Sequence, residues 1–106
     1  MIKFISIYSN GDVKVKKVDE LFPDEFVGPH YSHKVLDDIS DIYLISRNEL
    51  IGDRNPLIDN IISNFPCYGT CLIVRYDCNN VANPYISLDS EDVDYFLEKL
   101  GVSIEE

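Results

Sequence analysis

Thiols and imidazoles are the side chains of this sequence with the most specific chemistry. Three cysteines, Cys67, Cys71 and Cys78, follow two histidines, His30 and His33. Zinc prefers thiolate and imidazole ligands, and a thiol beside an imidazole can act as a nucleophile. However, the cysteine spacings fit neither a zinc ribbon nor a zinc finger, and histidines three residues apart on a strand point to opposite faces. We therefore expect no catalytic residues, no metal and no cofactor. A thiol or metal enzyme based on Cys67 is the third of three hypotheses.

Carboxylates gather in two places, a turn between two expected strands and one side of the expected last helix. General acid–base catalysis needs a carboxyl group held in an apolar pocket, whereas turns and helix starts leave carboxylates solvated. Such groups suit a surface that attracts a basic partner by long-range electrostatics. The predicted partner-binding residues are Glu91, Asp94 and Glu98, with Asp37, Asp38 and Asp41 secondary.

The N-terminal segment predicts a β-hairpin. Asn10-Gly11 is a strong hairpin signal, and it separates two β-branched, alternating segments at residues 4–8 and 13–18. A loop of residues 10–12 pairs Ile7 with Val15 and puts the apolar side chains on one face, which the core should select. We expect Gly11 or a neighbour to adopt a positive φ.

The same hairpin carries most of the local positive charge. Its other face should present Tyr8, Lys14 and Lys16, with Lys17 adjacent. Lysines beside an aromatic ring offer phosphate contacts and a stacking surface. The second hypothesis is therefore a protein that binds or sequesters a small ligand or nucleotide through Tyr8, Lys14, Lys16 and Lys17.

Composition limits the class of protein. The chain has 106 residues, a formal net charge of −10, 45% hydrophobic and 26% charged residues. This length fits one domain, residues 1–106, and the composition is that of a globular chain. No apolar run approaches the roughly 20 residues of a membrane-spanning helix, and the acidity argues against direct binding to nucleic acid or anionic membranes. Without a targeting signal, we expect reduced thiols and a cytoplasmic location.

The remaining pattern predicts an α+β fold. Apolar segments at residues 31–36, 42–46, 70–76 and 85–88 indicate strands, and residues 19–30 indicate a turn or short helix. Asn55-Pro56 begins a helix over about 55–64, and a second helix over 90–100 ends at Gly101. We expect a mainly antiparallel sheet of about five strands, with the N-terminal hairpin and two helices on one face.

Several short motifs after residue 26 resemble a known family. They are Val27-Gly28, Arg47-Asn48-Glu49 with Gly52, Asn55, Gly69, Asp77 and Leu88-Asp89-Ser90. Their order and spacing resemble a small phage- and plasmid-borne family, domain of unknown function three-eight-four-six. The resemblance implies an accessory protein of a virus or mobile element and supplies no catalytic residues.

The leading hypothesis is a small acidic protein-binding module that is not an enzyme. We expect an accessory or counter-defence inhibitor from a phage or mobile element, acting in the host cytoplasm as a monomer or homodimer. Its partner would be a basic host protein that binds nucleic acid, with the acids replacing phosphates. A duplex carries one charge per about 1.7 Å of axis, whereas a helix stripe offers one per roughly 5 Å. A nucleic-acid mimic would therefore need several acidic elements on one face.

Overall fold

The computed structural model describes residues 1–37, 41–80 and 82–102. The strands are β1 (Ile2–Ile7), β2 (Val13–Val18), β3 (Tyr31–Asp37), β4 (Ile42–Arg47), β5 (Cys71–Tyr76) and β6 (Tyr85–Ile86). The helices are α1 (Asp24–Val27), the 3₁₀ helix η1 (Pro56–Asn60) and α2 (Ser90–Leu100). The predicted α+β class, N-terminal hairpin and last helix are confirmed.

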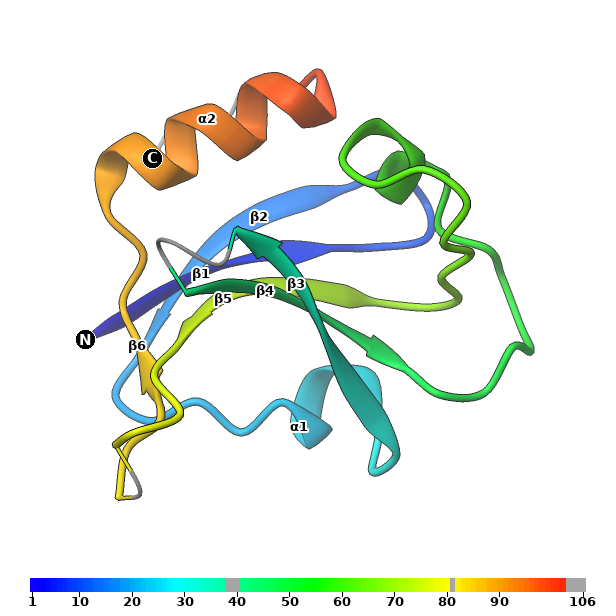
Figure 1. The fold of residues 1–106 in the computed structure, drawn as a ribbon. Coiled ribbons are helices and arrows are strands. Elements are labelled where there is room, and N and C mark those ends of the chain that lie inside the picture. The colour runs from blue at the N-terminus through cyan, green and yellow to red at the C-terminus, as the bar shows by residue number, and fades with distance from the viewer. Residues whose placement is uncertain (38–40, 81, 103–106) are drawn as a thin grey trace.

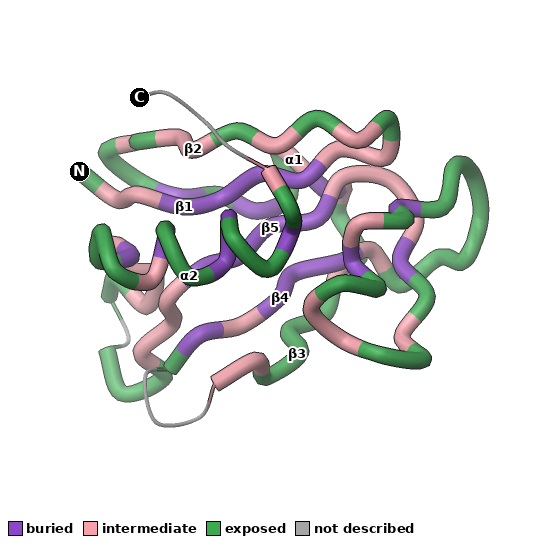
Figure 2. Tube along the Cα trace, turned by 90° about the horizontal axis from the view of Figure 1, so that it is seen from above, coloured by how far each residue is buried: buried purple, intermediate pink, exposed green. Residues whose placement is uncertain are grey.

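The strands described here form one antiparallel sheet with helices on both faces (Figure 1). The strand order is β2-β1-β5-β4-β3, and β6 pairs with the end of β5. Helix α2 lies over one face and α1 over the other (Figure 1). Strands β1, β5 and β4 carry most of the buried residues, and β2 and β3 are more exposed (Figure 2). Strand β3 therefore forms one edge of the sheet.

Alternation along the central strands produces two apolar layers. On the α2 side, Ile5, Leu44 and Ile73 pack against the apolar stripe of the helix. On the α1 side, Phe4, Ile45 and Leu72 pack against residues of the α1 segment. Side chains of successive strand residues point to opposite faces, so each central strand supplies both layers. The sheet is therefore buried on both faces at its centre.

The N-terminal hairpin has the expected faces but a different register. Val13 and Val15 share a face with Ile5 and Ile7, as expected, and Gly11 has a φ of 97°. However, Ile7 pairs with Val13, not with Val15. The predicted pairing is wrong by two residues, a shift that preserves the faces because the strand period is two. The amide N–H of Tyr8 donates to the carbonyl of Asp12 at 2.8 Å and closes the turn.

The helix that follows Asn55 is shorter and tighter than expected. Helix η1 covers Pro56–Asn60, whereas the sequence predicts a helix over 55–64. The side chain of Asn55 does not cap it but donates to the carbonyls of Ile7 and Gly69, at 2.9 and 3.0 Å. This buried amide therefore joins the start of η1 to β1 and to the segment before β5.

Helix α2 begins and ends on local signals. Asp89 and Asp92 form a capping box at its start, and Gly101 adopts the left-handed conformation at its end. Val93, Phe96, Leu97 and Leu100 are buried against the sheet. Among the described residues, none of the helices has the length and apolar character that crossing a membrane requires.

Candidate functional site

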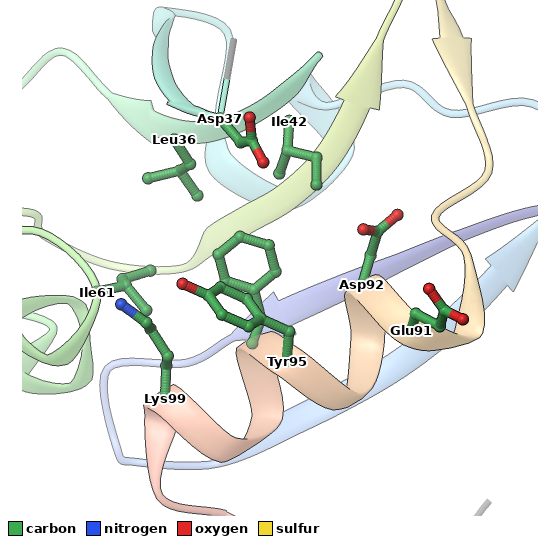
Figure 3. Close-up of a pocket in the computed structure, with 9 residues that line it drawn as sticks. Leu36, Asp37, Ile42, Ile61, Glu91, Asp92, Tyr95 and Lys99 are labelled. Carbon is green, nitrogen blue, oxygen red and sulfur yellow. The ribbon is translucent and has the colours of Figure 1, made fainter. Parts of the chain in front are cut away.

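A groove of about 410 Å³ lies between α2 and the adjoining ends of β3 and β4 (Figure 3). Its apolar lining comes from the sheet side, from η1's C-terminal flank and from the helix itself. We call it the α2 groove, and it is lined by Leu36, Asp37, Ile42, Ile61, Glu91, Asp92, Tyr95, Phe96 and Lys99. Strand β3 ends at Asp37 and β4 begins at Ile42, so the β3–β4 turn brings both residues to the same end of the sheet.

The α2 groove combines an apolar surface with acidic groups. Asp37 enters from β3, whereas Glu91 and Asp92 come from the first turn of α2 (Figure 3). Tyr95 projects between the two sides and is 53% exposed, so the groove has an accessible aromatic surface. The lining also includes one cation, Lys99, whose amine lies 5.3 Å from the centre of the Tyr95 ring. Three carboxylates against one ammonium leave the lining net acidic.

Arg75 fixes the start of α2 against the sheet. Its guanidinium lies 3.1 Å from a carboxylate oxygen of Asp92 and 3.4 Å from one of Asp89. The Asp92 side chain is 19% exposed and that of Arg75 is 21% exposed, so this pair is shielded from solvent. The charge of Asp92 is therefore largely balanced by Arg75. Asp37 and Glu91 are the other two carboxylates of the groove lining.

The structure brings together some of the predicted partner-binding residues and separates others. Asp37 and Glu91, far apart in sequence, line one groove. Asp94 and Glu98 are exposed on α2 but do not line it. Asp41 is exposed at the turn before β4, has a φ of 56°, and accepts a backbone hydrogen bond from Tyr76. The predicted Asp38 lies outside the described residues.

Three of the four predicted ligand-binding residues of the hairpin lie together. The amines of Lys14 and Lys16 lie 5.9 and 6.0 Å from the centre of the Tyr8 ring. Burial works to raise the pKa of Tyr8, but contacts with Ser6 and both lysines lower it overall. Lys17 pairs with Lys3 in the register and therefore lies on the opposite face of the sheet. The grouping of Lys17 with the other three as ligand-binding residues stays a prediction.

The thiols belong to the core, apart from one. Cys67 and Cys71 are buried, whereas Cys78 is exposed. The neighbouring Cys67 thiol and burial raise the pKa of Cys71. Both buried thiols lie near backbone carbonyls, at 3.6 Å for Cys67 and 3.9 Å for Cys71. In the part of the chain that the structure describes, no three His, Cys, Asp or Glu side chains gather as a metal-binding group would require.

Sequence reasoning missed a cluster of rings on the α1 side of the sheet. We call this the aromatic cluster; it consists of Tyr31, His33, Tyr43, Tyr76 and Tyr85. His33 lies at its centre, with ring centroids 4.8 to 6.1 Å from those of the four tyrosines. Burial lowers the pKa of His33, and burial together with the Tyr31 phenol raises that of Tyr85. The sequence shows that Tyr31 and His33, two residues apart on one strand, share a face of the sheet. The tyrosines on the other strands could not be added, because their positions depend on how the strands pair.

Comparison with known proteins adds no relative: no family model matches the chain, and neither a curated protein nor a solved structure matches it.

Proposed function

We propose that the protein is a protein-binding module whose α2 groove holds a basic amphipathic segment of a partner. The observation that carries this proposal is the α2 groove itself, in which an apolar wall and acidic side chains from distant parts of the chain meet. A groove of this kind can accept an apolar face while its carboxylates attract lysine or arginine beside it.

The apolar lining favours a peptide-binding groove over a surface that mimics nucleic acid. A mimic of the nucleic-acid backbone would bind its partner through charge alone, with acidic groups on several exposed elements. The partly exposed side chains of Leu36 and Ile61 instead offer apolar surface, and covering it with an apolar side chain of a partner lowers the free energy. Tyr95 is the kind of exposed aromatic residue that dominates the binding energy of many interfaces. An amphipathic basic peptide would contact both the apolar surface and the carboxylates, whereas a nucleic-acid mimic would need only the carboxylates.

We further propose that this module is an accessory or counter-defence inhibitor of a phage or mobile element. Its target would be a basic, nucleic-acid-binding host protein in the host cytoplasm. The net charge of −10 supports this choice of target, because opposite charge raises the rate of encounter with a basic partner. Occupation of the α2 groove would keep a basic segment of the target away from nucleic acid.

The test compares two double charge reversals on the same chain. Asp37→Lys with Glu91→Lys changes the α2 groove, and Asp94→Lys with Glu98→Lys makes the same charge change outside it. A partner captured from host lysate, identified by mass spectrometry, is then titrated against each purified variant at low and moderate salt. We expect the groove variant to lose at least about tenfold in affinity, corresponding to one or two lost charge contacts.

The control variant separates a defined site from general attraction. It should retain affinity within about threefold at moderate salt, because Asp94 and Glu98 do not line the α2 groove and salt weakens the attraction of exposed charges that make no direct contact. Equal losses for both variants would show that the partner responds to overall charge alone. No loss in either would remove the acidic groove as the binding site.

A further inference from the structure

A second hollow lies on the α1 side of the sheet, away from the α2 groove. It has a volume of about 330 Å³ and is lined by residues 20–24 and 82–85, with Ile2 of β1 and Tyr31 of β3. We call it the β6 pocket. Tyr31 and Tyr85 line it together with Phe22, which is 49% exposed. Its volume falls at the lower end of the range for small-ligand sites, about 300 to 1,000 Å³.

The charged residues that line the β6 pocket are all acidic. Glu20 and Asp24 line it, and its described lining contains no lysine, arginine or histidine. Both carboxylates are exposed, and neither takes part in the ion pairs formed among residues 1–37, 41–80 and 82–102. Lys16 is on the same face of the sheet, but its amine lies over the rings of Phe26 and Tyr8, at 5.5 and 6.0 Å.

Two aromatic residues of the pocket lining, Tyr31 and Tyr85, pack against other members of the aromatic cluster. Nε2 of His33 lies 2.8 Å from the Tyr85 hydroxyl, and the His33 and Tyr85 rings are stacked with centroids 5.9 Å apart. Tyr76 packs against Tyr85 at 5.1 Å, and His33 against Tyr31 at 5.8 Å. A wall that is already ordered loses little side-chain entropy when a ligand binds.

We propose that the β6 pocket binds a small organic cation with an alkylated ammonium head. The faces of aromatic rings attract a cation, most strongly one that is weakly hydrated, and carboxylates at the rim add to this attraction. A small metal ion would lose its hydration against the apolar residues Leu21, Pro23 and Pro84 and find few oxygen ligands in return. An alkylated ammonium group instead covers those residues with its own apolar surface.

Choline titrated into the full-length protein, followed by calorimetry and by ¹H–¹⁵N NMR, tests this assignment. The matched control ligand is 3,3-dimethylbutan-1-ol, which has the same shape and no charge. We expect choline to bind at least about tenfold more tightly than the alcohol, with amide shifts confined to residues around the β6 pocket. Equal affinities, or no shift with choline at tens of millimolar, would overturn the proposal.

Variants of the pocket separate the contribution of the rings from that of the carboxylates. Tyr31→Leu should weaken choline binding about tenfold, and Glu20→Gln with Asp24→Asn should weaken it several-fold. The exposed Glu49→Gln is the control and should leave binding unchanged. The charge variant alters only exposed side chains, so it remains informative if the Tyr31 variant fails to fold; unchanged binding there would contradict the assignment.

The same chemistry occurs in free metabolites and in methylated lysine side chains. A peptide with one trimethyllysine is therefore compared with choline and with its unmethylated form. Tighter binding of the methylated peptide than of choline assigns the source to a protein side chain, and the reverse order assigns it to a free small molecule. Equal binding of methylated and unmethylated peptides, with no choline binding, would exclude an alkylammonium site.

Discussion

Gly69 is the residue at which backbone conformation and packing most tightly restrict the choice of side chain. Its φ is +71°, and a Cβ there would lie 2.8 Å from Cζ and Nη2 of Arg47. The Nε of Arg47 is buried and finds no hydrogen-bond partner among the described residues, and the guanidinium lies beside Gly69 and Gly52. We predict that Gly69→Ala lowers the free energy of unfolding by about 2–3 kcal/mol, from left-handed strain and displacement of Arg47.

Gly101→Ala is the matched control for this prediction. Its φ is +74°, but a Cβ there would meet no atom within 4 Å. It should therefore lose only the left-handed strain, about 1 kcal/mol. Urea unfolding of both variants measures the difference. Equal losses would show that the close approach of Arg47 to Gly69 has no energetic consequence.

His33 should make the stability of the protein depend on pH. Contacts with four tyrosine rings shield part of the imidazole from water and lower its pKa below the ordinary 6.5, although the residue is exposed on the edge strand. The unfolded chain then takes up its proton at a higher pH than the folded one. Stability contributed by neutral His33 is therefore present above pH 6.5 and is lost as the pH falls below it.

His33→Gln should flatten the change in stability between about pH 6.5 and 5, above the range in which ordinary carboxylates titrate. Thermal unfolding across that range is the measurement, and His30→Gln, an exposed residue outside the aromatic cluster, is the control. If stability changes with pH as steeply in the His33 variant as in the unchanged protein, the assigned role of His33 is wrong.

Asn55 connects elements that are distant in the chain. Its amide donates to the carbonyl of Ile7 at the end of β1 and to that of Gly69 before β5, and the residue is 1% exposed. Asn55→Ala would leave two carbonyls without this donor, so we predict a loss of about 2–3 kcal/mol. Asn60→Ala, which removes one bond to the Leu100 carbonyl at 3.3 Å, should cost less than about 1 kcal/mol. Denaturant unfolding distinguishes the two, and the reverse order would contradict the assigned roles.

The elements that could be predicted from sequence depend on local signals. The bounds of α2 follow from Asp89, Gly101 and a stripe of buried apolar residues, all within the helix and its caps. The helix after Asn55 could not be bounded in this way, because tertiary carbonyls take the side chain that would otherwise cap it. The predicted hairpin register differs from the observed one by two residues. Both registers bury the same side chains, so the apolar pattern cannot distinguish them.

At the scale of the molecule, the sites depend on contacts that a linear pattern does not encode. The helical spacing of Glu91, Asp94 and Glu98 predicted a shared stripe, but only Glu91 lines the α2 groove. Asp37 joins Glu91 because β3 ends where α2 crosses the sheet, which is a matter of tertiary packing. The β6 pocket also needs four separate segments, and no one of them carries a recognisable motif.

The excess of acidic residues should weaken the folded state at low ionic strength. The net charge is −10, and ion pairs in the described part of the chain involve only Arg54 and Arg75. Self-repulsion between carboxylates is screened by salt. The exposed Arg54–Asp59 pair contributes little, and the shielded Arg75–Asp92 pair is screened less by salt. We predict that the melting temperature rises by a few degrees between low and moderate sodium chloride. A fall over that range would show that attractive pairs dominate.

Occupation of the α2 groove by a basic amphipathic segment is the central claim, and an NMR titration tests it most directly. The ¹⁵N-labelled protein is titrated with a designed helical peptide of leucine and lysine, and separately with its leucine–glutamate counterpart. The account predicts that the basic peptide shifts amide resonances of Asp37, Ile42 and Tyr95, while the acidic peptide does not. Shifts spread over the whole acidic surface, or equal shifts with both peptides, would contradict it.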